Sequence, residues 1–430
     1  MTAAVSATAR SLAALPRLSS RTRPLADGEV ADLLDVLAAD GFAWMRGDAG
    51  FVTAGVAARI PVATGPHRLE QAASSVAETL ASIDVDGPAP SDCRPRAVGA
   101  LPFDDRTSGS LVIPSLIVTR RPDGSAVVTT IGPADALPDP ERIVHRDGGA
   151  TPGASAAPVG LREEPGRADW TRSVRRILSA IDAGGVRKVV LARQLVVEAA
   201  TPFDRRAILD RLRRSHPSCF TYAAGGFVGA SPELLIRRRG HGVSSCPMAG
   251  TVRRGATAEE DEALTAGLRR SVKEAEEHRL LVEAVVAALT PVCVETPTAG
   301  DPDVVRFPTV SHLATRVSGV LRRPAPSALA LAGLLHPTPA VGGLPRTEAL
   351  AAIAALEGFD RGLYAGPVGW VDANGDGEWA VALRGAQLDG TRARLAAGAG
   401  IVAGSDPEAE WAETEAKLRP MLAAVGVVPS

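Results

Sequence analysis

Two patterns of apolar positions divide this chain into predicted strands and helices. Short runs of apolar, often β-branched residues bounded by glycine or proline predict strands, as in "KVVLARQLVVE" from Lys188 and "GEWAVALRGAQLDG" from Gly377. Apolar residues spaced three and four apart predict helices. The predicted helices cover residues 27–39, 169–183, 259–289, 327–335, 346–356 and 407–425. Strands fall mostly in neighbouring pairs and helices in separate blocks, which favours an α+β fold over a doubly wound sheet.

The same patterns divide the chain into three regions. Residues 1–26 have no acidic residue and are rich in Ala, Arg and Ser, so we expect a disordered tail, with an organellar transit peptide as the alternative. Residues 27–165 form a weakly characteristic N-terminal part of the fold, which ends in a structureless surface connection from about residue 135. Residues 166–430 carry the densest signals and are the expected catalytic region.

Composition narrows the class of protein. Hydrophobic residues make up 45% and charged residues 22% of 430 residues, which is typical of a globular protein. A formal net charge of -2 gives no electrostatic reason to expect nucleic acid or an anionic membrane as partner. The longest apolar run, Ala325–Leu335, is too short to span a bilayer. Four scattered cysteines without a CxxC pair argue against a disulfide framework or zinc site, and fit a cytoplasmic protein.

Lysine is rare in this chain, and its positions are therefore informative. Of 47 basic residues only Lys188, Lys273 and Lys417 are lysines. A guanidinium is always charged, whereas a desolvated lysine can lose its proton. Lys188 stands within an apolar run, so it is a candidate general base.

Two pairs of acidic residues are candidates for metal binding. Glu274 and Glu277 lie three apart on one predicted helix, and Glu410 and Glu413 repeat this spacing on another. Each pair therefore shares one helix face. If the two helices met, four carboxylates would form an oxygen-only site that suits Mg²⁺. A single such pair is more often a solvated helix face, and the spacing does not establish that the helices meet.

Further candidates come from charged residues and glycines in strands. Glu233 follows Ser-Pro, where apolar neighbours would raise the pKa of its carboxyl and suit it to general acid work, although it could be a turn residue at a sheet edge. Arg384 lies in an apolar strand and could bind a carboxylate, or could be snorkelling or ion-paired. Gly398, Gly400 and Gly404 miss the GxGxxG spacing, so a dinucleotide site is unsupported, but their backbone could approach an anion.

Ten ordered segments together resemble a known family. They are "KVVLAR", "GASPELL", "PMAGTVRRG", "KEAEEH", "HLATRVSG", "HPTPAVGGLPR", "FDRGLYAGPVGW", "GDGEWAVALR", "AGAGIV" and "EWAETEAKL". They resemble those of the chorismate-utilising enzymes, which include isochorismate, salicylate, anthranilate and aminodeoxychorismate synthases. The resemblance covers roughly Arg172–Val425. It implies a large single catalytic domain with extended antiparallel β-sheets flanked by helices.

The resemblance also implies roles for the candidate residues. In the members that add water, the lysine at the position of Lys188 is the general base, and the glutamate at the position of Glu233 is the general acid. It implies that Mg²⁺ is held directly by two glutamates and through water by two others, at the positions of Glu277 and Glu413 and of Glu274 and Glu410 respectively. The metal binds the ring carboxylate of chorismate. The remaining substrate-binding positions are Arg384, Gly398, Gly400, Lys417, His312 and Tyr364, although the residue at Tyr364 differs among subfamilies.

The segment "HPTPAVGGLPR" from His336 resembles the dedicated isochorismate synthases. We therefore expect a Mg²⁺-dependent isochorismate synthase, an isomerase that adds water at C2 of chorismate and removes the C4 hydroxyl. Salicylate synthase, which adds a pyruvate-eliminating step, is the alternative, and a non-catalytic chorismate-binding homologue is a third possibility that Lys188 and Glu233 argue against. No amidotransferase subunit is expected. The pathway could be siderophore or menaquinone biosynthesis.

Overall fold

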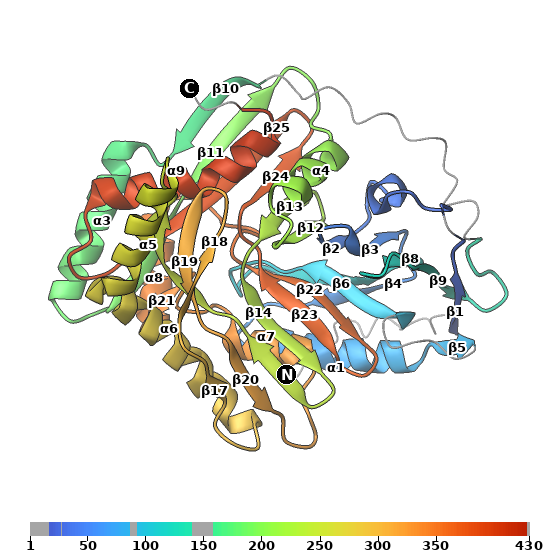
Figure 1. Ribbon diagram of the computed structural model, residues 1–430. Coiled ribbons are helices and arrows are strands. Elements are labelled where there is room, and N and C mark those ends of the chain that lie inside the picture. The colour runs from blue at the N-terminus through green and yellow to red at the C-terminus, as the bar shows by residue number, and fades with distance from the viewer. Residues whose placement is uncertain (1–16, 27, 87–92, 140–157, 428–430) are drawn as a thin grey trace, which may run out of the picture.

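The computed structural model describes residues 17–26, 28–86, 93–139 and 158–427 (Figure 1). Two large sheets form most of the molecule. Helices cover the outer faces of these sheets and one end of the molecule, where the red C-terminal helix lies. The principal hydrophobic core lies between the sheets, because buried side chains from both, such as Trp44 and Trp379, belong to one packed cluster. The predicted α+β class with extended antiparallel sheets is confirmed.

The first sheet has thirteen strands, and all its pairings are antiparallel except that of β1 with β5. Strand β21 (Gly343–Leu344) pairs with β11 beside the main path. The others are, in spatial order, β10 (Pro158–Glu164), β11 (Lys188–Ala199), β25 (Arg392–Ile401), β24 (Gly385–Asp389), β13 (Phe227–Ser231), β12 (Phe220–Ala224), β2 (Ala43–Arg46), β3 (Ala49–Ala54), β8 (Leu116–Arg120), β9 (Ala126–Pro133), β1 (Leu18–Pro24) and β5 (Asp84–Asp86).

The second sheet has nine strands and a third sheet has three. The order of the second is β17 (Thr298–Ala299), β20 (Val317–Val320), β15 (Gly242–Ser245), β14 (Leu234–Arg239), β23 (Gly377–Val381), β22 (Pro367–Asp372), β6 (Arg96–Ala100), β7 (Gly109–Ile113) and β4 (Ala58–Val62). The third consists of β16 (Met248–Arg253), β19 (Val310–Ala314) and β18 (Asp303–Arg306). Both large sheets contain strands from either side of residue 165, so the two expected parts of the chain share their sheets.

The helices lie at the ends and on the outer faces of these sheets (Figure 1). They are α1 (Arg68–Ala81), α3 (Arg167–Asp182), α4 (Arg205–Ser215), α5 (Ala258–Arg270), α6 (Val272–Leu289), α7 (Ala328–Leu335), α8 (Arg346–Leu356) and α9 (Pro407–Ala424), with short 3₁₀ helices η1 (Leu33–Val36) and η3 (Thr290–Val292). Helix α9 packs on β25, and both α6 and α9 contact β16. Two helices distant in sequence therefore meet above one small sheet.

Four sequence predictions of secondary structure are corrected. The predicted helix over residues 27–39 is wrong: the Asp32 carboxylate caps the Leu34 N–H, and only η1 forms. The predicted single helix over 259–289 is divided at Ser271, whose extended backbone ends α5 and whose hydroxyl caps α6. Part of the expected tail, Leu18–Pro24, is strand β1, while residues 1–16 lie outside the described residues. Part of the expected surface connection, Pro158–Glu164, is strand β10.

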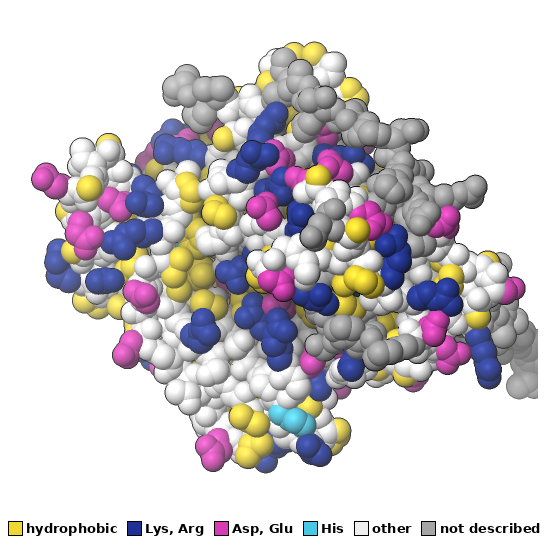
Figure 2. Space-filling view, turned by 45° about the vertical axis from the view of Figure 1, so that its right-hand side comes forward, with side chains coloured by type: hydrophobic (Ala, Val, Ile, Leu, Met, Phe, Trp, Pro, Cys, Tyr) yellow, Lys and Arg dark blue, Asp and Glu magenta, His cyan; other side chains and the backbone are white. Residues whose placement is uncertain are grey.

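The surface agrees with the nearly neutral composition. Basic and acidic side chains are interspersed over the face seen in Figure 2. Within the described part of the chain, no helix has the length and apolar character needed to cross a membrane.

Candidate active site

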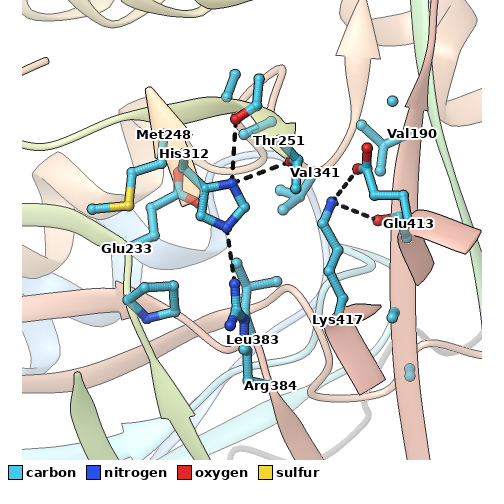
Figure 3. Close-up of a pocket in the computed structure, with 18 of the residues that line it drawn as sticks. Val190, Glu233, Met248, Thr251, His312, Val341, Leu383, Arg384, Glu413 and Lys417 are labelled. Carbon is cyan, nitrogen blue, oxygen red and sulfur yellow. Dashed lines mark hydrogen bonds and ion pairs between the residues drawn. The ribbon is translucent and has the colours of Figure 1, made fainter. Parts of the chain in front are cut away.

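A cavity near the ends of β11 and β25 collects most of the candidate residues (Figure 3). Its walls come from the first large sheet, the small third sheet, helices α6 and α9, and loops such as those that carry Glu233 and Arg384. Ten of the twelve residues to which the sequence gives a catalytic, substrate-binding or metal-binding role line it: Lys188, Glu233, Glu277, His312, Tyr364, Arg384, Gly398, Gly400, Glu413 and Lys417. Glu274 and Glu410 do not line it but lie on the same two helices, one turn away.

Lys188 is the first residue of β11, and its side chain is only 1% exposed. Strand β11 is interior to the first sheet and is apolar along nearly all its length. A buried ammonium needs a compensating charge. That charge comes from helix α6, where Glu277 Oε1 lies 2.7 Å from Lys188 Nζ. The contact is an ion pair, whereas the sequence argument expects a neutral amine.

A second ion pair of the same kind lies on α9. Lys417 Nζ donates to Glu413 Oε1 at 2.6 Å and to the Gly398 carbonyl oxygen at 3.0 Å (Figure 3). Burial would raise the pKa of Glu277, but the charge and hydrogen bond of Lys188, with smaller help from Lys417, hold that pKa below its usual range. Glu277 is therefore charged at neutral pH, and Glu277 and Glu413 each face a lysine.

The two outer glutamates have the opposite electrostatic character. Burial and the charge of Glu277 raise the pKa of Glu274 to about 7, and its Oε2 accepts a hydrogen bond from the Thr251 backbone at 3.2 Å. Burial and the charge of Glu413 raise the pKa of Glu410. Like charges at close range raise carboxyl pKa values in this way, so the four glutamates form one electrostatic cluster.

This cluster fits a hexacoordinate Mg²⁺ better than a metal enclosed by protein. Among the described residues, no three His, Cys, Asp or Glu side chains converge tightly enough to hold an ion by themselves. Mg²⁺ keeps several waters and takes one or two carboxylates plus ligand oxygens, so it does not require a closed cage. A divalent cation would also relieve the repulsion that raises the pKa values of Glu274 and Glu410. The donor set and its charge therefore fit Mg²⁺.

Glu233 lies between β13 and β14, and only 4% of it is exposed. Ser231 fixes the bend that carries it: its hydroxyl accepts from the Glu233 N–H at 3.2 Å and donates to the Val381 carbonyl at 2.5 Å. Burial raises the pKa of Glu233 to about 8, and the more distant charges of Lys188 and Lys417 only partly oppose this. Glu233 is therefore a carboxylic acid that keeps its proton near neutral pH.

Arg384 is held in the cavity wall by His312. Its Nη2 donates to His312 Nε2 at 2.9 Å, so the histidine proton is on Nδ1, which faces Thr251 Oγ1 at 3.1 Å and the Gly250 carbonyl at 3.3 Å (Figure 3). Burial and the charge of Arg384 hold the pKa of His312 well below its usual value. Within the described residues, Arg384 Nη1 is buried without a hydrogen-bond partner. This buried Nη1 can donate to an anion in the cavity. The backbone of Arg384 also has a positive φ of 50°, which is uncommon for a residue other than glycine.

Two glycines of β25 leave the space in which these groups meet. A Cβ on Gly400 would lie 2.7 Å from Glu277 Oε1 and 3.0 Å from Lys188 Cε. A Cβ on Gly398 would lie 3.1 Å from the Leu191 carbonyl oxygen and 3.4 Å from the Tyr364 hydroxyl. A larger residue at position 400 would therefore displace the side-chain ends of the Lys188–Glu277 ion pair.

Two residues of this region have no role assigned from the sequence. Arg361 lines the cavity and donates to the carbonyls of Val190 at 2.8 Å and Val341 at 2.7 Å, while Glu357 neutralises it. It lies in the segment "FDRGLYAG", from which only Tyr364 was chosen. Lys273 contacts Glu410 at 3.3 Å; its rarity as a lysine and its position beside Glu274 were the available signals.

Comparisons with known proteins find one matching family and several similar proteins. The family described as chorismate binding enzyme matches residues 12–426. The isochorismate synthase DhbC of Bacillus subtilis is 35% identical over 384 residues, 87% of this chain and 90% of that protein. The isochorismate synthase EntC of Escherichia coli K12 is 35% identical over 407 residues, 93% and 98% of the two chains. The solved structure of MenF, the menaquinone-specific isochorismate synthase from Escherichia coli, has a TM-score of 0.80 at 28% identity and covers 95% of each chain.

We predict that Glu233 makes the stability of the protein depend on pH. Its pKa is about 8 when folded against a reference value of 4.5. The stabilisation from its bound proton is therefore complete below pH 4.5 and is lost as the pH rises through about 8. Relative to Glu233→Gln, the wild type should lose roughly 3–5 kcal/mol of unfolding free energy between pH 4.5 and 9. Denaturant titrations of both proteins across this range measure the difference, and parallel pH dependences would contradict the raised pKa.

Proposed function

We propose that this chain, which belongs to the chorismate-binding enzyme family, is an isochorismate synthase. The observation that carries the proposal is that one cavity contains both a buried lysine, Lys188, and a buried carboxylic acid, Glu233. A reaction that adds water at one ring carbon and removes a hydroxyl at another needs one base and one acid. The match to curated isochorismate synthases along nearly the whole chain supports the same activity.

The two carboxylates of chorismate would find separate partners in the cavity. Arg384 Nη1 has no partner among the described residues, and it can donate to the enolpyruvyl carboxylate. The backbone of β25 at Gly398 and Gly400 can approach the same group closely, because neither residue has a side chain. The ring carboxylate would lie toward the glutamates of α6 and α9.

The reaction then follows from the two buried groups. Lys188 Nζ removes a proton from water, and the resulting hydroxide forms a bond to ring C2 as the double bonds shift. The bond from C4 to its hydroxyl breaks, and the leaving oxygen takes the proton of Glu233 and departs as water. One water enters and one leaves. Glu233 regains its proton, and Lys188 loses the one it took, through solvent.

The four glutamates would hold Mg²⁺, with Glu277 and Glu413 as direct ligands and Glu274 and Glu410 acting through water. When bound, the metal would neutralise the ring carboxylate and help to orient the ring. Glu277 is also the ion-pair partner of Lys188 at 2.7 Å. A metal held by Glu277 would compete with Lys188 for this carboxylate and would weaken the ion pair that opposes the proposed role of Lys188 as a base.

The proposed chemistry also limits the partners. Water is the nucleophile, so the reaction needs no ammonia and we propose that no amidotransferase subunit takes part. The four cysteines are scattered along the chain without a CxxC pair, which fits a reducing compartment. We therefore propose that the enzyme acts in the cytoplasm, on a small-molecule substrate.

We predict that the product is isochorismate, released without elimination of pyruvate. The enzyme incubated with chorismate and Mg²⁺ near neutral pH should give a mixture of chorismate and isochorismate, because the conversion is reversible. Chromatography of a long incubation measures both compounds. Equal accumulation of salicylate and pyruvate at the rate of chorismate loss would instead identify a salicylate synthase, and no turnover would leave a chorismate-binding homologue.

We predict that Lys188→Ala lowers kcat by roughly 10²–10⁴-fold, because the attacking water loses its base. Lys188→Arg is the matched control: it keeps a cation opposite Glu277 but cannot accept a proton. Steady-state kinetics and circular dichroism of both variants separate the loss of a base from the loss of a counter-ion to Glu277. If Lys188→Arg were active and Lys188→Ala inactive, Lys188 would serve only as a counter-ion.

We predict that activity depends on Mg²⁺, and that the four glutamates contribute unequally. Glu277→Gln and Glu413→Gln should raise the Mg²⁺ concentration for half-maximal activity more than Glu274→Gln and Glu410→Gln, because direct ligands contribute more than residues that act through water. Activity is measured over a range of free Mg²⁺ for each variant. Full activity in excess chelator would refute the metal role, whereas equal losses at all four positions would refute only the division of labour.

A further inference from the structure

All three lysines of the chain contact the four-glutamate cluster. Lys188 pairs with Glu277 at 2.7 Å, Lys417 with Glu413 at 2.6 Å, and Lys273 with Glu410 at 3.3 Å. The 44 other basic residues are arginines, since the sequence holds 47 basic residues and three lysines. The three lysines therefore all lie at one site, although every other basic residue of the chain is an arginine.

Lys273 differs from the other two lysines in position and exposure. Its side chain is 41% exposed, against 1% for Lys188 and 23% for Lys417, and it does not line the cavity. It lies at the start of α6 and reaches across to α9, so its ion pair joins the two helices that carry the glutamates. The partner carboxylate of Glu410 is nearly buried, at 5% exposed. Lys273 therefore stands at the solvent side of the cluster.

The three lysines already compensate three of the four glutamates when neither a metal nor a substrate is bound. A divalent cation alone would add two positive charges to this largely buried site. A dianionic substrate bound together with the cation would cancel them. Because uncompensated buried charge is costly, the metal and the dianion should favour each other's binding.

We propose that Lys273 is a counter-cation of this cluster that exchanges with the metal. It pairs with Glu410 when the metal is absent, and so keeps metal binding weak when no anionic substrate is present. The proposal rests on the proposed Mg²⁺-dependent function. Lys273 is suited to the role because its flexible stem can swing into solvent, whereas Lys188 and Lys417 are enclosed by the cavity. Several carboxylates feel its charge: Glu410 most strongly, then Glu274 and Glu277.

The test is the affinity of the free protein for Mg²⁺, measured by isothermal titration calorimetry without chorismate. Lys273→Met keeps the length of the side chain and removes its charge, and it should bind Mg²⁺ roughly five- to tenfold more tightly than the wild type. Lys273→Arg keeps the charge and should stay within about twofold of the wild type. Arg392→Met removes a cation of similar exposure, 49%, from its pair with Glu198 and should leave Mg²⁺ affinity unchanged. Equal or weaker binding by Lys273→Met overturns the proposal.

Thermal unfolding separates this role from a purely structural one. In chelator, Lys273→Met should melt below the wild type, because Glu410 is left without its ammonium. In saturating Mg²⁺ the difference should shrink or vanish, because the metal compensates the same carboxylates. An equal loss of Tm in both conditions would make Lys273 a simple helix-to-helix link and overturn the exchange. Both measurements use the substrate-free protein, so their failure is distinguishable from a wrong assignment of the product.

Discussion

The burial of the Lys188 ammonium is the constraint from which the arrangement of the site follows. An ammonium at the start of an apolar strand inside a thirteen-stranded sheet is not stable without a carboxylate at contact distance. Glu277 supplies that carboxylate only if α6 docks over the end of β11. Glu277 and Glu274 on α6 then lie near Glu413 and Glu410 on α9, which packs on β25, and Lys273 bridges the two helices.

Strand β25 turns this meeting of charges into a cavity. Its segment "AAGAG" has alanine or glycine at five consecutive positions, so the sheet face beneath α9 carries almost no side-chain volume. The absence of a side chain at Gly400 leaves room for the Lys188–Glu277 ion pair. The carbonyl oxygen of Gly398 accepts a hydrogen bond from Lys417. The low aromatic content and the many alanines of the chain thus have a local use, because small residues leave room for a ligand where larger ones would fill it.

Most of the candidate site could be predicted from the sequence, because short motifs identify chemically important residues even when their contacts in the fold are unknown. Lys188, Glu233 and Arg384 were chosen as charged residues in apolar surroundings, and the structure brings all three to one cavity. The Lys188–Glu277 ion pair could not be predicted from the sequence, because 89 residues separate the partners and only the fold determines that they meet. The helix predicted over residues 27–39 is wrong although its apolar residues are buried, because the Asp32 cap and the packing of η1 on the sheet favour a single 3₁₀ turn.

Two glutamates in this cavity show how position alone separates an acid from a charged ligand. Glu233 and Glu277 are both largely enclosed and both lie within the field of Lys188 and Lys417. Glu277 touches an ammonium at 2.7 Å, and the direct contact outweighs burial, so its pKa falls. Glu233 receives no such contact from its described neighbours, so burial prevails and its pKa rises to about 8. Coulomb attraction falls with distance, whereas the cost of burial does not. A carboxyl group a few ångströms farther from the lysine is therefore a proton donor instead of the anionic partner in an ion pair. The Ser231 bend that fixes Glu233 is therefore as much a part of the proposed chemistry as the acid itself.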